Sequence, residues 1–200
     1  GDYPDIIVGC TGGGSNLAGL MFPFLGQQLR GGQKIDIIGC EPLSCPSFTK
    51  GKYAYDHGDM ARMTPLIKMH TLGSDFLPPA NHSGGLRYHG MSYHLSHLYD
   101  LGLMRAKAYG QKDCFEAGVI FGKEEGIIPA PEGNHAVKGA IDAALECKAK
   151  GESKTILFNL CGHGHFDMTA YDDYFNGRLA DDFYDEETAN QSLSRLPEIG

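Results

Sequence analysis

The sequence predicts an α/β fold, with an open, mainly parallel sheet and helices on both faces. Three short apolar runs, residues 5–10, 35–40 and 155–160, lack the alternation of a strand that has one face in water, as expected for strands covered on both sides. The segments 15–30 and 135–150 carry apolar residues at helical spacing. A glycine-rich turn joins the first strand to the first helix, which indicates a right-handed βαβ unit.

The segment 15–30 is the first predicted helix, because its large apolar residues recur at intervals of three and four. Pro23 lies inside it, and we expect this residue to kink the helix or to mark its true start. Further helices are predicted over 113–124 and over 135–150, the latter with Gly151 as its C-cap.

Two stretches are predicted to lie outside the sheet. Residues 42–92 contain several prolines, glycines and histidines with little periodicity, and we expect a long loop there. The chain is rich in aspartate and glutamate from residue 167 onward, which predicts a solvated surface extension. The predicted organisation is one α/β domain over residues 1–166, followed by an acidic extension over residues 167–200.

Composition excludes several classes of protein. The 200 residues carry 17 basic and 25 acidic side chains, a net charge of −8, whereas proteins that bind a nucleic-acid backbone are usually basic. No apolar run approaches the roughly 18 residues of a membrane span. The six cysteines show no Cys-x-x-Cys spacing, and this favours a reduced, cytoplasmic protein. The 28 glycines are about twice the usual share, which indicates many tight turns.

The sharpest local signal is Gly12-Gly13-Gly14-Ser15-Asn16, between a predicted strand and a predicted helix. Glycines allow backbone N–H groups to turn inward, and a helix N-terminus adds positive potential, so this turn is suited to a phosphate or a carboxylate. The turn lacks the lysine of a Walker loop and the spacing of a dinucleotide turn. A tight turn without a ligand stays open as the alternative.

A second glycine turn, Cys161-Gly162-His163-Gly164-His165, follows the last predicted strand. Ligands of open parallel sheets collect beyond the carboxyl ends of the strands, so we expect both turns to face one crevice, with Cys161 pointing into it. A small buried thiol is the alternative for Cys161. The histidines show no standard zinc-ligand spacing, and we expect no zinc site. The histidines considered are His82, His89, His94, His97, His163 and His165.

Four segments, taken in order, resemble a known family. They are Gly12–Asn16, Gly85-Leu86-Arg87-Tyr88-His89-Gly90, Glu125-Gly126-Ile127-Ile128-Pro129-Ala130 and Cys161-Gly162-His163-Gly164. Together they are similar to the C-terminal half of the tryptophan synthase β family, whose enzymes use pyridoxal phosphate (PLP), and in particular to its second, stand-alone class. The resemblance implies the C-terminal domain fold of type II PLP-dependent enzymes.

The resemblance also implies roles for single residues. Gly12–Asn16 would hold the cofactor phosphate, Cys161 would lie beside the pyridine nitrogen, and Gly162 would also belong to the cofactor-binding residues. Glu125 matches the acid beside the cofactor ring. A thiol is too weak an acid to keep the ring nitrogen protonated, and a neutral pyridine is a milder electron sink. This suits elimination of a β-hydroxyl followed by attack of a nucleophile such as indole.

Further implications concern ions and partners. Main-chain carbonyls near Gly12, Leu86 and Tyr88 match a region that binds a monovalent cation, Na⁺ or K⁺, in the family. The small-molecule partners would be an amino acid and indole. A homodimer is implied, dependence on an α-chain partner is left open, and neither nucleic acid nor membrane is expected.

The implied activity is PLP-dependent β-replacement, in which L-serine and indole give L-tryptophan and water. The family's Schiff-base lysine lies in an N-terminal half, and the eleven lysines here follow no matching motif. We therefore expect a longer protein to be the enzyme and this chain alone to be inactive. Two alternatives stay open: β-elimination of serine or threonine, which the loop 82–90 would decide, and a non-catalytic phosphate-binding module.

Overall fold

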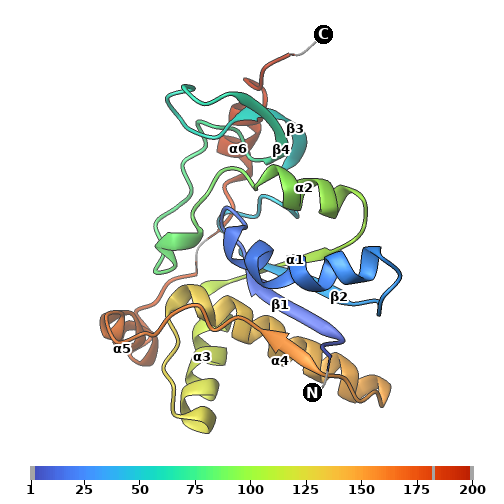
Figure 1. Cartoon of the computed structure of the whole chain (residues 1–200). Helices are drawn as coiled ribbons and strands as arrows, with labels where there is room; N and C mark the ends of the chain where they lie inside the picture. Colours follow the sequence, from blue (N-terminus) through green and yellow to red (C-terminus); the bar gives the residue numbers. More distant parts are fainter. Residues whose placement is uncertain (1–2, 182, 199–200) are drawn as a thin grey trace.

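The computed structural model describes residues 3–181 and 183–198 and shows the predicted α/β architecture (Figure 1). The main sheet has four parallel strands in the order β5-β2-β1-β6, and β3 and β4 form a separate antiparallel pair. The strands are β1 (Ile6–Cys10), β2 (Asp36–Pro42), β3 (Lys52–His57), β4 (Leu66–Thr71), β5 (Arg105–Tyr109) and β6 (Ile156–Phe158).

Helices cover both faces of the main sheet, which confirms the predicted fold class (Figure 1). Side chains of β1 alternate between the faces: Ile7 packs with Leu17 and Leu95 on one side, and Val8 packs with Ala143 on the other. The first layer contains α1 (Ser15–Leu29) and α2 (Tyr93–Asp100), and the second contains α3 (Gln111–Glu125) and α4 (Pro131–Lys150).

Pro23 does not set the start of α1, which begins at Ser15 and continues through the proline to Leu29. Met21 and Leu25, on either side of Pro23, are buried against the sheet, and this packing offsets the hydrogen bond that proline removes. The helix predicted over 135–150 begins earlier, because Pro131 at its first turn has a φ suited to that position.

The expectation of a long loop over residues 42–92 was wrong in part, because β3 and β4 lie there as a hairpin, together with the short 3-10 turn η1 (Gly84–Leu86). Buried polar residues in these strands break the apolar alternation that would have predicted them: the hydroxyl of Thr71 in β4 donates to Asp56 in β3 at 2.6 Å. The strand β5 was also not predicted, since Arg105 and Lys107 make it look like a surface segment.

The acidic tail forms two helices, α5 (Met168–Phe175) and α6 (Glu186–Leu193). Tyr171 and Ala189 are buried against the body of the protein, so the expectation of a solvated extension was wrong for these side chains. The many acidic residues of this segment outnumber the few apolar residues that pack against the body of the protein, so the sequence pattern does not indicate the packing. The division at residue 166 stays a prediction, and residues 1–2, 182 and 199–200 lie outside the described residues.

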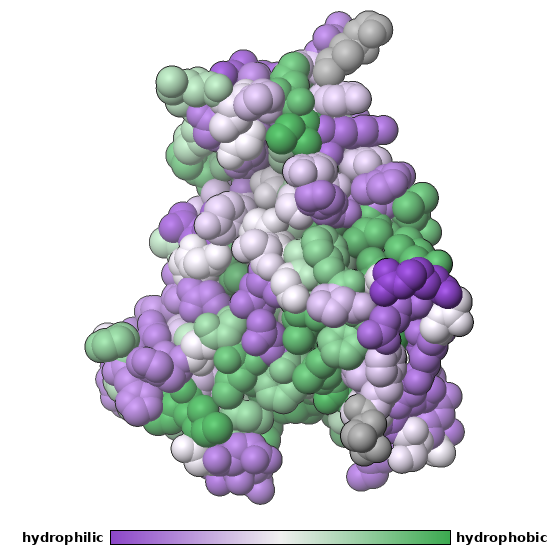
Figure 2. Space-filling model, viewed as in Figure 1, coloured by the Kyte–Doolittle hydropathy of each residue, from purple (hydrophilic) through white to green (hydrophobic). Residues whose placement is uncertain are grey.

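The sheet ends on one side at β6, which pairs only with β1 among the described strands. In the view of Figure 1 and Figure 2, apolar surface lies in the lower part of the molecule, where α4 and β6 are found. No helix in the described ranges is long and apolar enough to cross a membrane. A shallow apolar hollow beside β6 is lined by Phe121, Val137, Ala140, Ile141, Ala144, Ile156 and Phe158.

Candidate functional site

Both glycine-rich turns lie at the carboxyl edge of the main sheet. Gly12–Asn16 joins β1 to α1, and Cys161 follows the end of β6 in the chain. A hollow of about 250 Å³ opens at this edge. One of its walls is the first turn, and the other is the segment around η1, which lies far away in the sequence. The hollow is lined by Cys10, Gly12, Gly13, Gly14, Ser15, Asn16, Gly85, Leu86 and Tyr88.

Two glycines are required for the shape of this hollow. Gly14 caps α1 with a φ of 94°, a left-handed conformation that side chains disfavour. A Cβ atom at Gly12 would lie 2.7 Å from Cα of Leu86 and 2.9 Å from the carbonyl oxygen of Gly85. Only glycine at position 12 therefore lets the two walls approach. The three atoms nearest to a Cβ atom at Gly13 would all belong to the ring of Tyr88, the first of them at 3.7 Å.

The turn lines the hollow, and two of its polar groups are held by neighbours. Ser15 and Asn16 begin α1, and the first amides of a helix have no partner within the helix. The carbonyl oxygen of Gly13 accepts from the amide of Ser92 at 2.9 Å, and Oδ1 of Asn16 accepts from Nδ2 of Asn159 at 2.9 Å. The donor set and the helix dipole suit a phosphate group.

Glu132 is a residue at this edge that sequence reasoning missed. Its Oε1 accepts a hydrogen bond from the amide of Gly85 at 2.8 Å, so α4 holds η1 against the turn. Leu86, beside this bond, is buried against Cys10 and Ala136. The contact joins residues 47 positions apart, and no local pattern could have indicated it.

Cys10 and Cys161 lie in contact beside the hollow, with their Sγ atoms 3.4 Å apart. Cys10 is buried and Cys161 is exposed, so a negative charge costs less free energy on Cys161 than on Cys10. The hydrogen bond between them lowers the pKa of Cys161 and raises that of Cys10, and the burial of Cys10 adds to the latter effect. The alternative of a buried thiol at 161 is excluded.

Glu125 does not line the hollow. It is exposed at the end of α3, where Gly126 caps the helix in a left-handed conformation with a φ of 71°. The segment after it does reach the carboxyl edge: the amide of Ala130 donates to the carbonyl oxygen of Gly162 at 3.0 Å. Gly162 thus fixes this segment, and the ring-side role of Glu125 stays a prediction.

Of the backbone carbonyl groups near which we expect a monovalent cation, those of Leu86 and Tyr88 already accept hydrogen bonds. The oxygen of Leu86 accepts from the amide of Tyr88 at 3.0 Å, and the oxygen of Tyr88 accepts from the Cys45 thiol at 2.8 Å. Among the described residues, no three His, Cys, Asp or Glu side chains come together in a way that could hold a metal ion. The rings of His163 and His165 contact each other, with centroids 4.8 Å apart.

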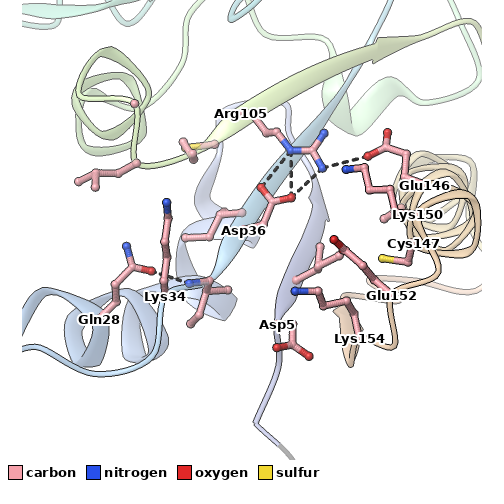
Figure 3. A pocket seen from close by; sticks show the side chains of 17 residues that line it. Asp5, Gln28, Lys34, Asp36, Arg105, Glu146, Cys147, Lys150, Glu152 and Lys154 are labelled. Carbon is pink, nitrogen blue, oxygen red and sulfur yellow. Dashed lines mark hydrogen bonds and ion pairs between the residues drawn. The ribbon is translucent and has the colours of Figure 1, made fainter.

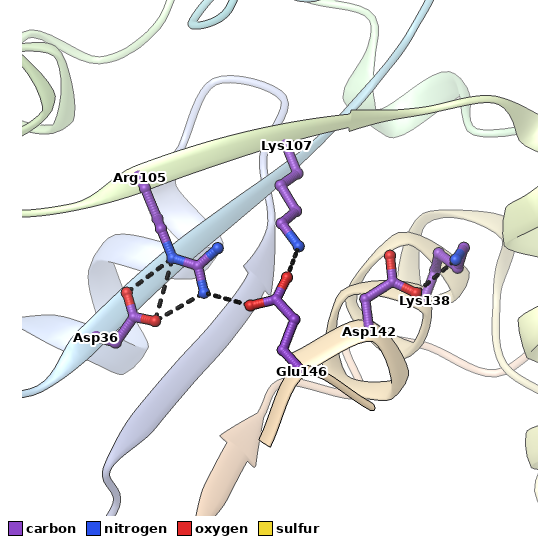
Figure 4. A network of polar contacts seen from close by, with 6 residues as sticks. All are labelled: Asp36, Arg105, Lys107, Lys138, Asp142 and Glu146. Atoms are coloured by element: carbon purple, nitrogen blue, oxygen red, sulfur yellow. Dashed lines mark hydrogen bonds and ion pairs between the residues drawn. The ribbon is translucent and has the colours of Figure 1, made fainter. Parts of the chain in front are cut away.

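A larger hollow of about 630 Å³ lies at the opposite, amino edge of the sheet (Figure 3). Several of its charged groups are paired with one another: Nη2 of Arg105 lies 2.7 Å from Asp36 and 3.5 Å from Glu146, and Lys107 also binds Glu146 (Figure 4). These pairs hold β2, β5 and α4 together. Ligands of open parallel sheets collect at the carboxyl edge. We therefore assign the functional site to the smaller hollow at that edge, although this hollow at the amino edge has the larger volume.

Comparisons with known proteins identify the family of the chain. A profile of the family described as pyridoxal-phosphate dependent enzyme matches residues 1–162. The tryptophan synthase beta chain 2 of Methanosarcina mazei is 57% identical over 178 residues, which cover 89% of this chain and 40% of that protein. The protein of the same name from Aquifex aeolicus is 56% identical over 184 residues, 90% of this chain and 42% of that protein.

The chain therefore spans about two fifths of the length of these relatives. Among solved structures, a fungal L-serine ammonia-lyase from Rhizomucor miehei matches with a TM-score of 0.62 and 14% identity, over 89% of this chain and 51% of that one. This likeness shows a shared fold. Because the family profile covers most of the chain, the chain belongs to the pyridoxal-phosphate dependent enzymes.

Proposed function

We propose that the protein to which this chain belongs makes L-tryptophan and water from L-serine and indole. The observation that carries the proposal is the hollow itself, in which the turn Gly12–Asn16 meets the segment 85–88, together with 50–57% identity to proteins named tryptophan synthase beta chain. Two motifs of the resemblance that are distant in the sequence thus line one hollow. Their meeting supports a shared task better than either motif alone.

The cofactor phosphate would lie on the amides of Gly13, Gly14, Ser15 and Asn16, because amides at a helix N-terminus bind anions. The glycines keep the space for it open: a Cβ atom at Gly12 would force the walls apart, and a larger side chain at Gly13 would enter the hollow. PLP supplies an electron sink for bonds at the α-carbon of an amino acid. The Cys161 thiol would face the ring nitrogen, and it is too weak an acid to keep that nitrogen charged. Leu86 and Tyr88 would offer apolar surface on the substrate side.

The isolated chain would hold the cofactor without turning over substrate. Within the described residues, no lysine lines the hollow, and the chemistry needs a lysine amine to bind the cofactor and move the α-proton. Substrate orientation needs further groups that hold the carboxylate. The cation near Gly12, Leu86 and Tyr88, the homodimer, an α-chain partner and the cytoplasmic location belong to the same proposal.

The test compares the purified chain alone with the chain supplied with the N-terminal part of the Methanosarcina mazei relative. We expect weak, phosphate-competed PLP binding by the chain alone and no tryptophan from serine and indole. The mixture should form tryptophan. Release of pyruvate or 2-oxobutyrate without tryptophan would instead favour β-elimination. Turnover by the chain alone would contradict the proposal that the isolated chain is inactive.

A further inference from the structure

All six cysteines of the chain are described, and the thiols of Cys10 and Cys161 are in contact with each other. Cys40, Cys45, Cys114 and Cys147 are buried. Burial raises the pKa of Cys40 and of Cys45 to about 12, which leaves both in the unreactive thiol form at neutral pH. Cys161 is the one exposed cysteine of the six, and its thiol contacts that of Cys10.

We propose that Cys10 and Cys161 are a reversible oxidation site, which a peroxide converts to a disulfide at the wall of the hollow. The backbone places the two thiols on adjacent parallel segments: β1 pairs with β6, and beyond it the amide of Asn159 donates to the carbonyl oxygen of Val8 at 3.2 Å. The proposal therefore follows from the sheet register as well as from the 3.4 Å between the Sγ atoms.

Closing the bond requires only a small movement. A disulfide has an S–S distance of about 2.05 Å, so the sulfur atoms must approach each other by roughly 1.4 Å. Cys10 is fixed in β1, at 2% exposure, whereas Cys161 lies in a segment without helix or strand. The movement can therefore come from the backbone around Cys161, and the sheet need not distort.

The chemistry balances with hydrogen peroxide as oxidant. The exposed Cys161 thiolate attacks one peroxide oxygen, which forms a sulfenic acid as the O–O bond breaks and the second oxygen leaves as water after taking a proton. The Cys10 thiol then attacks the sulfenic sulfur, the S–O bond breaks, and the proton of Cys10 leaves with that oxygen as a second water. Two thiols and one peroxide give one disulfide and two waters.

The consequence for the cofactor rests on the proposed function. Cys161 would be the group that faces the ring nitrogen, and Cys10 lines the hollow. The disulfide holds the sulfur of Cys161 in a covalent bond and draws it toward β1, away from the place of the ring nitrogen, so the oxidised chain should bind PLP more weakly. The same bond shields both sulfurs from irreversible oxidation, and a dithiol reductant restores them.

The test treats the purified 200-residue chain with one equivalent of hydrogen peroxide and reads intact mass and a non-reducing peptide map. We expect a loss of about 2 Da, a cross-linked peptide pair containing Cys10 and Cys161, and reversal by dithiothreitol. Cys10→Ala and Cys161→Ser should abolish the cross-link. Cys147→Ala is the matched control, since it removes a thiol at the opposite edge and should leave the cross-link intact.

A gain of about 32 Da on Cys161 without any cross-link in the parent chain would overturn the proposal, and so would equal oxidation of all six thiols. Circular dichroism of each variant shows whether it is folded before its result is used. The mass readout does not depend on tryptophan formation, so it can fail while the proposed function stands. PLP titration of the oxidised chain should give at least a tenfold weaker affinity, and an unchanged affinity would overturn the link to the cofactor.

Discussion

The carboxylate of Glu132 accepts a hydrogen bond from the backbone amide of Gly85, with the oxygen and nitrogen atoms 2.8 Å apart. Glu132 lies in the first turn of α4, and Gly85 lies in η1. Because η1 provides one wall of the hollow, this single contact ties the helix that covers the sheet to the shape of the proposed cofactor site.

Replacing Glu132 should therefore loosen the wall without unfolding the sheet. Glu132→Ala removes the acceptor of the Gly85 amide, and we expect a loss of about 1 kcal/mol in the free energy of unfolding and a several-fold weaker PLP affinity. Glu132→Gln keeps a carbonyl oxygen for this bond and should retain most of the affinity. Urea unfolding and PLP titration measure the two effects, with Glu124→Gln on the exposed end of α3 as control. Equal behaviour of the Ala and Gln variants would contradict the role of the bond.

Gly12→Ala should disrupt the hollow by steric overlap. Its Cβ atom would lie 2.7 Å from the backbone of Leu86, so η1 must move away and the PLP affinity should fall at least tenfold. Gly19→Ala in α1 is the matched control, because its Cβ atom meets nothing within 4 Å and alanine favours a helix by about 1 kcal/mol. The control should raise the thermal midpoint and leave PLP binding unchanged. A Gly12→Ala protein with unchanged affinity would show that the two walls need not meet.

Gly13→Val should weaken anion binding by a different route. The space beside Gly13 is open toward the ring of Tyr88, so valine can fold into the structure while it fills the hollow. We expect the variant to bind inorganic phosphate and PLP more weakly, so that phosphate no longer competes measurably with PLP. The thermal midpoint should change little. Isothermal titration with phosphate and with PLP provides the measurement, and full phosphate affinity in this variant would place the anion elsewhere.

Glu41 should make the stability depend on pH. Burial raises its pKa to about 7, even though it accepts bonds from the amides of Phe48 and Thr49 at 2.9 Å each. A raised pKa in the folded state means that the folded chain holds this proton more tightly than the unfolded chain does. The protonated Glu41 carboxyl group contributes to the free energy of unfolding. This contribution is complete below pH 4.5 and is lost as the pH rises through about 7, by up to about 3 kcal/mol.

The check is urea unfolding of the parent chain and of Glu41→Gln between pH 5 and pH 8. Glutamine cannot ionise, so the variant should lack this part of the pH dependence. At pH 5 it should be the less stable protein, because one amide hydrogen-bond donor of glutamine faces the donor of Phe48. Parallel curves for the two proteins would contradict the assignment.

The pairs around Arg105 should contribute little and be sensitive to salt. Asp36 and Arg105 are about 40% exposed, with side-chain values of 42% and 38%, so the ion pair is screened by solvent. Asp36→Asn should lower the free energy of unfolding by less than about 1 kcal/mol at low salt, and the difference should shrink at 1 M NaCl. A large loss that persists at high salt would show a more demanding role for this edge of the sheet.

The sequence by itself determined the fold class, three strands of the main sheet and the glycine turn at the start of α1. These features have local signals, since buried parallel strands are continuous apolar runs and a left-handed turn demands glycine at position 14. It also identified the four motifs of the resemblance. Strand β5 and the β3–β4 hairpin were missed, because the ion pairs of Arg105 and Lys107 and the hydrogen bond from Thr71 to Asp56 form only in the folded chain.

Only the tertiary structure decided which of these motifs meet. It brought the segment 85–88 onto the glycine turn, placed Glu132 at that wall, and left Glu125 exposed at a helix end. It also set Cys10 against Cys161 across 151 positions of sequence. Such contacts depend on strand order and on how a helix crosses a sheet, and neither is written in any local pattern of residues.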